Sequence, residues 1–320
     1  MQRRRALLSM GYSKDIGDEA LEYLTMEALE DGFQAKLSIN SCQYSIDGKT
    51  WVNLPANTYT NSINAGDKLY FKATNLTPIV QNTFGQDAGI GTFTTTKKFN
   101  LSGNVMSMLF GDEASDNDSL VGYNHAFNAL FANNTNLKNV SEGFLPAKTI
   151  SLGCYRCMFR NCSNVETAPN IQATQLQQEC CHAMFYGCSS LKQCPKIMST
   201  ALGYSCCTYM FYGCSSIEET PDLPVMTLTD YCYGSMFRNC TNLKRCSNLP
   251  AQTSKYKCYQ YMFNGCSNLT YIKAMLTPNS TNTEYWVQGV SSSGTFVARS
   301  NTSWSYGIAG IPSGWTIKYE

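Results

Sequence analysis

Cysteines are the most numerous side chains in this sequence that could carry out chemistry. The chain of 320 residues contains sixteen cysteines, fifteen of them between Cys154 and Cys266. Such a set can bind zinc, form disulfides or pack as free thiols in a core. A structural zinc site needs two clustered ligand pairs, whereas Cys154 and Cys157 form a single C-x-x-C pair. Zinc is therefore the least favoured of the three.

Disulfides are possible if the cysteines belong to stacked repeats, because stacked strands lie roughly 5 Å apart, within the Cα range of a disulfide. Cysteines in one ladder would point in parallel, however, and bridging would require each of them to rotate. Free thiols packed as small, polarisable core residues are the interpretation we favour. No metal and no cofactor is predicted.

Catalytic motifs are missing from the sequence, which contains no Walker-type loop, no G-x-S-x-G elbow and no H-E-x-x-H. The two histidines are His125 and His182, and His182 takes a position that varies between repeats, as a surface residue would. The acidic residues near position 115 do not have EF-hand spacing and are interpreted as a solvated loop; they are Asp112, Glu113, Asp116 and Asp118. We expect no catalytic residue and no enzyme activity.

The cysteines belong to a tandem repeat built around the dipeptide Met-Phe. It recurs every 26 residues, at Met158, Met184, Met210, Met236 and Met262. One cysteine lies four residues before each Met, at Cys154, Cys180, Cys206, Cys232 and Cys258. Another lies four residues after it, at Cys162, Cys188, Cys214, Cys240 and Cys266. A unit of this length cannot bury its own apolar face, so stacked copies forming a solenoid are predicted.

The four-residue spacing places Cys154, Met158 and Cys162 on one face of a short helix. The residue before the second cysteine is Gly or Asn in every copy, as expected for a left-handed residue that ends a helix. A turn and a short strand follow. The predicted fold is a mixed α/β repeat, a solenoid of 26-residue helix–turn–strand units.

The frame running from Cys258 to Leu269, Cys-Tyr-x-x-Met-Phe-x-Gly-Cys-Ser-x-Leu, resembles the BspA-like leucine-rich-repeat family. This cysteine-rich form occurs in surface proteins of gut bacteria and in proteins of their phages. The resemblance implies a leucine-rich-repeat solenoid with a binding role. A degenerate copy at 130–137 has Asn134 in place of the second cysteine, and 108–111 resembles a still weaker copy.

Four segments are predicted along the chain. Residues 1–20 form an arm with the basic run at Arg3, Arg4 and Arg5, and residues 21–100 form a small immunoglobulin-like β-sandwich. Its strands include a hairpin over 43–52 and segments 68–73 and 91–96. The solenoid covers 101–276. Residues 277–320 form a Trp-containing C-terminal cap.

Composition restricts the partners. The net charge of +1 and the absence of a long basic block argue against nucleic-acid binding. No segment approaches the roughly 20 apolar residues that span a bilayer, so no membrane insertion is expected. The charged fraction is only 15%, which predicts a surface of neutral polar residues and Tyr.

Candidate binding residues follow each Met-Phe, where the repeat varies. They are Arg160, Tyr186, Tyr212, Arg238 and Asn264. Tyr and Arg are common anchors in interfaces. A second variable column contains Glu166, Lys192, Glu218, Lys244 and Thr270. Its alternating charges fit either ligand binding or salt bridges between repeats.

A surface-type repeat without a visible secretion signal favours a phage protein on the virion surface. We expect a capsid or tail decoration, resembling a fibre, that binds a host-surface glycan or protein and contacts other virion proteins through the basic arm. A bacterial cell-surface adhesin of the BspA-like type is the alternative, and a cytoplasmic scaffold is a third possibility. A homo-oligomer fits each of these settings.

Overall fold

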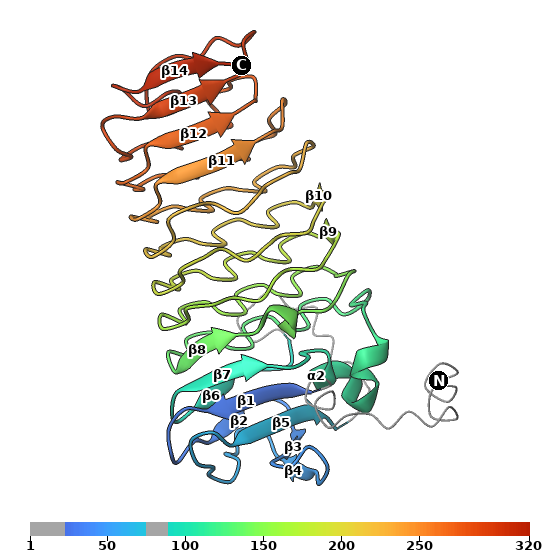
Figure 1. Cartoon of the computed structure of the whole chain (residues 1–320). Coiled ribbons are helices and arrows are strands. Elements are labelled where there is room, and N and C mark those ends of the chain that lie inside the picture. Colours follow the sequence, from blue (N-terminus) through green and yellow to red (C-terminus); the bar gives the residue numbers. More distant parts are fainter. Residues whose placement is uncertain (1–22, 75–88) are drawn as a thin grey trace, which may run out of the picture.

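The computed structural model describes residues 23–74 and 89–320 as one elongated body, with a β-sheet at one end and stacked turns above it (Figure 1). The predicted basic arm over 1–20 lies outside the described residues. The main hydrophobic core runs from Leu24 to Trp315. The repeat solenoid is confirmed, but two features of the predicted fold class are wrong.

The N-terminal region is built on a six-stranded sheet in the order β4-β3-β5-β1-β7-β8. Its strands are β1 (Leu24–Ala28), β3 (Cys42–Ser45), β4 (Val52–Leu54), β5 (Lys68–Ala73), β7 (Phe99–Ser102) and β8 (Leu137–Val140). A separate two-stranded sheet pairs β2 (Ala35–Leu37) with β6 (Phe93–Thr95). The predicted hairpin is present as the antiparallel pair β3–β4.

The predicted immunoglobulin-like sandwich is wrong, because the N-terminal sheet continues into the solenoid and does not form a separate two-sheet domain. The edge of β7 pairs in parallel with β8, the first strand of the solenoid. Phe93 of β6 likewise stacks on Phe131 of the degenerate repeat, with ring centroids 5.5 Å apart. The N-terminal sheet therefore serves as the base on which the first turns are stacked.

The predicted repeat helix is also wrong. Between Cys154 and Cys162 the backbone forms a series of β-turns, which we call the turn ribbon. Alternate N–H groups bond within the turn, as Met158 N does to Tyr155 O at 3.2 Å. The intervening N–H groups point along the solenoid axis to the next repeat, as Phe159 N does to Met184 O at 2.9 Å. An α-helix would direct all of them back along its own chain.

Left-handed residues recur at every fourth position of the turn ribbon. In one repeat they are Gly153, Cys157 and Asn161, with φ of 62°, 54° and 58°. They take the third position of alternate turns, where a type II turn requires positive φ. The left-handed conformation expected of the Gly or Asn before the second cysteine is confirmed, although it ends a turn and not a helix.

The phenylalanines of the Met-Phe pairs, together with Phe93 and Phe131, form a buried stack along the solenoid, here called the Phe ladder. Neighbouring rings have centroids 5.4–6.0 Å apart and planes within 16° of parallel. The members are Phe93, Phe131, Phe159, Phe185, Phe211, Phe237 and Phe263. Each ring is no more than 1% exposed.

The second cysteine of each repeat bonds to this ladder. The thiol of Cys188 donates to Phe159 O at 3.1 Å, and Cys162, Cys214, Cys240 and Cys266 make the same contact one repeat below them. In the degenerate copy, Asn134 Nδ2 donates to Phe93 O at 3.2 Å. The amide therefore makes the bond that the thiol makes elsewhere.

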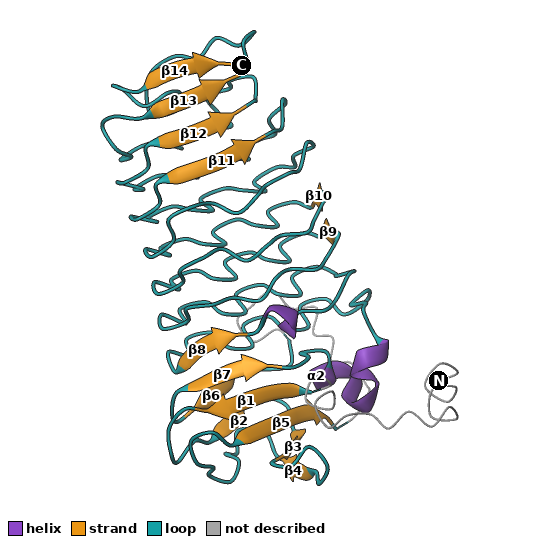
Figure 2. Cartoon of the chain, viewed as in Figure 1, coloured by secondary structure: helices purple, strands orange, loops and turns teal. Residues whose placement is uncertain are grey.

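The remaining strands of the solenoid are short and parallel. They are β9 (Gln175–Leu176) paired with β10 (Ala201–Leu202), and the sheet of β11 (Arg245–Leu249), β12 (Tyr271–Ala274), β13 (Thr295–Ala298) and β14 (Thr316–Tyr319). Most of each turn is loop, and helix is confined to the base (Figure 2). The helical segments among the described residues are α2 (Ser107–Phe110), η2 (Gly111–Asp116) and η3 (Glu142–Phe144). The weak repeat copy at 108–111 is thus helical.

Tryptophans cover the far end of the Phe ladder. Trp286 lies 6.1 Å from Phe263, and Trp304 stacks on Trp286 at 5.6 Å. The indole nitrogen of Trp286 donates to Gly310 O at 2.9 Å. This arrangement shields the last repeat from water, as a solenoid requires.

Candidate binding surface

The predicted binding residues lie on the turn ribbon, on the outer side of the Phe ladder, and all five are half-buried. The rings of Tyr186 and Tyr212 stack with centroids 4.6 Å apart and planes 2° from parallel. The guanidinium of Arg160 lies 5.1 Å from the Tyr186 centroid. The structure therefore brings residues from three successive repeats into direct contact.

The stack continues beyond the predicted column. The guanidinium of Arg238 lies 5.8 Å from the ring of Tyr212 and 4.9 Å from that of Tyr261. Tyr261 then stacks on Tyr285 at 5.1 Å. We call this series of planar groups the Tyr–Arg ladder; its members are Arg160, Tyr186, Tyr212, Arg238, Tyr261 and Tyr285.

Asn264, the fifth predicted residue, leaves the ladder and donates a hydrogen bond to Gln288 Oε1 at 2.9 Å. Sequence reasoning missed Tyr261 and Tyr285. Tyr261 lies in the position directly before Met, where Tyr209 also stands, so a comparison of that column could have found it. Tyr285 lies after the last regular copy, outside the 26-residue period.

The stacking fixes how these residues face the solvent. Ring faces lie against neighbouring rings, so the ring edges, phenol hydroxyls and guanidinium N–H groups are left to meet a ligand. Tyr212 is held further by Asn239 Nδ2, which donates to its hydroxyl at 3.0 Å. Each cation–π contact of this kind contributes about 0.5–1 kcal/mol at an exposed site.

The ladder carries positive charge that is not neutralised within it. Arg160 and Arg238 form no ion pair with the residues that the structure describes, whereas Arg156 lies 3.4 Å from Glu179. His182 packs edge-on against Tyr209 at 5.7 Å. Burial lowers its pKa to about 4, with Arg156 and Arg160 adding to the effect. His182 is therefore half-buried, like the predicted binding residues, and is neutral at pH 7.

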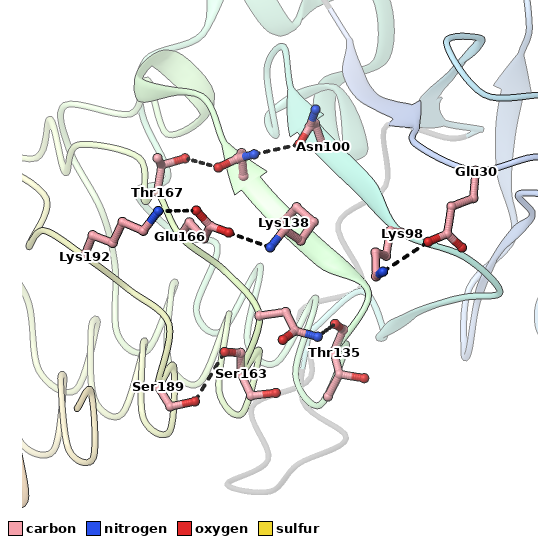
Figure 3. Close-up of polar contacts among 12 residues, drawn as sticks. Glu30, Lys98, Asn100, Thr135, Lys138, Ser163, Glu166, Thr167, Ser189 and Lys192 are labelled. Atoms are coloured by element: carbon pink, nitrogen blue, oxygen red, sulfur yellow. Dashed lines mark hydrogen bonds and ion pairs between the residues drawn. The ribbon is translucent and has the colours of Figure 1, made fainter. Parts of the chain in front are cut away.

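The second variable column lies on the strand side of the turns, where charges pair between repeats (Figure 3). Glu166 accepts from Lys138 at 2.6 Å and from Lys192 at 2.5 Å. Glu218 pairs with Lys244 at 2.8 Å. Hydrogen bonds from Lys138 and Lys192 lower the pKa of Glu166 to about 2. The predicted salt bridges between repeats are confirmed for these residues, so much of this column's charge is already neutralised.

The cysteines form buried ladders of free thiols. Fifteen are buried, and Cys194 is half-buried. Burial raises the pKa of Cys162, Cys240 and Cys246 to about 12. The adjacent thiols of Cys180 and Cys181 lie 3.8 Å apart. A nucleophilic or metal-binding cysteine acts as the thiolate, and burial of this kind suppresses that form.

Neither a metal site nor a membrane-spanning element is found in the described part of the chain. No group of three or more His, Cys, Asp or Glu side chains within 23–74 and 89–320 is arranged to hold a metal ion. Asp112, from the acidic loop, bonds to Lys72 Nζ at 2.7 Å and to the Tyr23 hydroxyl at 2.8 Å. Among the same residues, no helix has the length and apolar character needed to cross a bilayer.

Comparisons of the chain with protein-family models, with curated proteins and with solved structures gave no match. The resemblance to BspA-like leucine-rich repeats therefore remains a prediction from the repeat frame. What can be stated of the protein's class is its architecture, a cysteine-rich solenoid of stacked turns on an N-terminal β-sheet.

Proposed function

We propose that the protein is a non-enzymatic binding protein whose ligand contacts the Tyr–Arg ladder. The observation that carries this proposal is the continuous stack from Arg160 to Tyr285 on the outside of the turn ribbon. Stacked side chains are already ordered, so they lose little conformational entropy when a ligand binds. Tyr and Arg are also the residue types that most often dominate binding energy.

The ligand is a glycan or protein on a cell surface. The ladder presents phenol hydroxyls and guanidinium groups, which donate hydrogen bonds to carbonyl, carboxylate or sugar oxygens. The buried thiols, with their raised pKa values, support a role without nucleophilic catalysis.

The biological setting that we propose is the surface of a phage virion, with host attachment as the role. This rests on the resemblance of the repeat frame to the BspA-like family. Residues 1–20 would attach the protein to other virion proteins. The alternative is a bacterial cell-surface adhesin of the same repeat type.

Binding of the full chain to candidate host cells tests the role of the ladder. We expect the double variant Tyr186→Ala/Tyr212→Ala to bind at least about tenfold more weakly than the wild type. The matched control is Lys192→Gln/Lys244→Gln, which removes two charges from the strand side and should leave binding intact. Equal binding by wild type and the tyrosine variant would refute the proposal.

The location of the protein distinguishes a virion protein from a bacterial cell-surface adhesin. Peptides from 101–276 should appear at constant stoichiometry in purified virions, as measured by quantitative mass spectrometry. Their recovery only from shaved bacterial cells would favour the adhesin. Protease or glycosidase treatment of the target cells distinguishes a protein ligand from a glycan.

A further inference from the structure

A hollow lies beside the last member of the Tyr–Arg ladder. It has a volume of about 360 Å³ and is lined by Ser280, Thr281, Glu284, Tyr285, Ile308 and Ala309. This volume falls within the range of roughly 300–1,000 Å³ that is typical of small-ligand sites. The hollow combines one aromatic ring, one carboxylate, two hydroxyls and two apolar side chains.

The aromatic ring of this hollow has one face covered. Tyr261 stacks on Tyr285 with planes 12° apart. Among the described residues, no ring stacks on Tyr285 from the other side. Tyr285 is therefore the last ring of the ladder and lines the hollow, whereas the rings of Tyr186 and Tyr212 stack on each other.

The carboxylate of Glu284 is positioned by its neighbours. Oε2 accepts from Gln260 Nε2 at 2.7 Å and lies 3.8 Å from Lys257 Nζ. Oε1 makes no hydrogen bond to the described residues and can accept one from a ligand hydroxyl. The exposed hydroxyls of Ser280 and Thr281 lie at the same hollow and are likewise without a partner among the described residues.

The apolar side is formed by Ile308 and Ala309. Ile308 is 47% exposed, and the backbone next to it is fixed because Ala309 O accepts from the Thr283 hydroxyl at 2.7 Å. The exposed side chain of Ile308 and the ring of Tyr285 line the same hollow and give it a non-polar surface, and the carboxylate and hydroxyls add polar groups beside it.

We propose that this hollow binds one neutral sugar ring, such as the terminal or branching residue of a glycan. The non-polar C–H face of a pyranose would pack on Tyr285 and Ile308, and its hydroxyls would bond to Glu284, Ser280 and Thr281. An acidic sugar would place its own carboxylate near Glu284 and is disfavoured. This assignment rests on the proposed function, because it names the ligand class for one end of the Tyr–Arg ladder.

Saturation-transfer NMR on the full chain tests the assignment, with methyl glycosides of glucose, galactose, mannose and N-acetylglucosamine as probes. We expect at least one of them to bind, with the strongest transfer to its ring C–H protons. Tyr285→Ala should weaken that binding about tenfold, whereas Tyr285→Phe should retain it. The matched control is Tyr204→Ala, which removes an exposed tyrosine outside the hollow.

Ser280→Trp provides a second test, since it fills the rim of the hollow and leaves every residue of the ladder unchanged. It should abolish saturation transfer to the sugar in a chain that unfolds at the same urea concentration as the wild type. Absence of transfer to all four sugars, or equal transfer in the wild type and Tyr285→Ala, would overturn the assignment. If host-cell binding still depended on Tyr186 and Tyr212 in that case, the proposed function would stand without this sugar site.

Discussion

Two stacks of planar side chains run along the solenoid, and they differ in burial and in residue composition. The Phe ladder is buried and contains one residue type, whereas the Tyr–Arg ladder is half-buried and varies from copy to copy. Four pairs of neighbours in the sequence contribute to both, for example Phe211 and Tyr212. The core fixes where each outer residue stands, and the outer residue type is left free to suit a ligand.

The largest effect is expected from high pH, which should destabilise the core that contains the buried cysteines and the Phe ladder. Burial raises the pKa of five thiols from 9.0 to about 12, namely Cys42, Cys154, Cys162, Cys240 and Cys246. Their stabilising contribution is complete below pH 9 and is lost as the pH rises through 12, because only the unfolded chain ionises in that range. At about pH 10 each thiol loses about 1.4 kcal/mol, so the combined loss is about 7 kcal/mol.

Urea unfolding at several pH values between about 8 and 10 checks this, with thiolate absorbance recorded in parallel. The unfolding midpoint should fall steeply above pH 9, and thiolate should form only as the chain unfolds. A midpoint that stays constant across this range would show that the inner cysteines are not held as neutral thiols.

Truncating neighbouring members of the two ladders should give unequal losses of stability. Phe211→Ala removes a fully buried ring between Phe185 and Phe237 and should reduce the free energy of unfolding by about 3–5 kcal/mol. Tyr212→Ala should reduce it by about 1 kcal/mol, because it removes only the stacking of a half-exposed ring. Chemical denaturation of both variants tests the difference, and similar losses would mean that the outer ladder is part of the core.

The thiol-to-carbonyl bonds should have a smaller effect. Cys214→Ala deletes the bond to Phe185 O and should lower stability by about 1 kcal/mol. The carbonyl keeps its bond from Cys188 N at 3.1 Å, so it is not left without a partner. Cys214→Ser can still donate and should lose less than Cys214→Ala. The opposite order, measured by thermal unfolding, would show that the volume of sulfur matters more than the bond.

The smallest effect is expected on the strand side. Glu166→Gln removes the carboxylate between Lys138 and Lys192, whose hydrogen bonds lower its pKa from 4.5 to about 2. The contribution of Glu166 is present above pH 4.5 and is lost as the pH falls through 2, so the variant should differ from wild type at neutral pH and converge with it in acid. High salt should also reduce the difference in melting temperature. A difference that persists in acid would contradict the ion-pair explanation.

The sequence was sufficient to predict the solenoid, the buried cysteine columns and four members of the Tyr–Arg ladder. It could not distinguish a helix from the turn ribbon, because both place residues such as Cys154, Met158 and Cys162 on one side at four-residue spacing. The bonds that decide between them run to the next repeat, and no local pattern records them. Non-glycine residues at positive φ, such as Cys157 and Tyr209, hid the other left-handed positions.

The immunoglobulin-like sandwich failed for a related reason. The strands were located correctly in the hairpin and over 68–73, but their partners depend on contacts far along the chain. The pairing of β7 with β8 joins residues on either side of α2 and η2. Tyr285 was missed because the last turn departs from the 26-residue period, so its position appears only once the turns are stacked.

The alternation of hydrogen bonds in the turn ribbon has a consequence for how such a protein can change. In the turn ribbon, the backbone N–H groups that leave one repeat bond to the next repeat, and they use the same positions from copy to copy. A whole 26-residue unit could therefore be duplicated or deleted by recombination without leaving a mismatched junction. The length of the molecule, and the number of outer side chains that it displays in a row, could vary between descendants while the two ends stay the same.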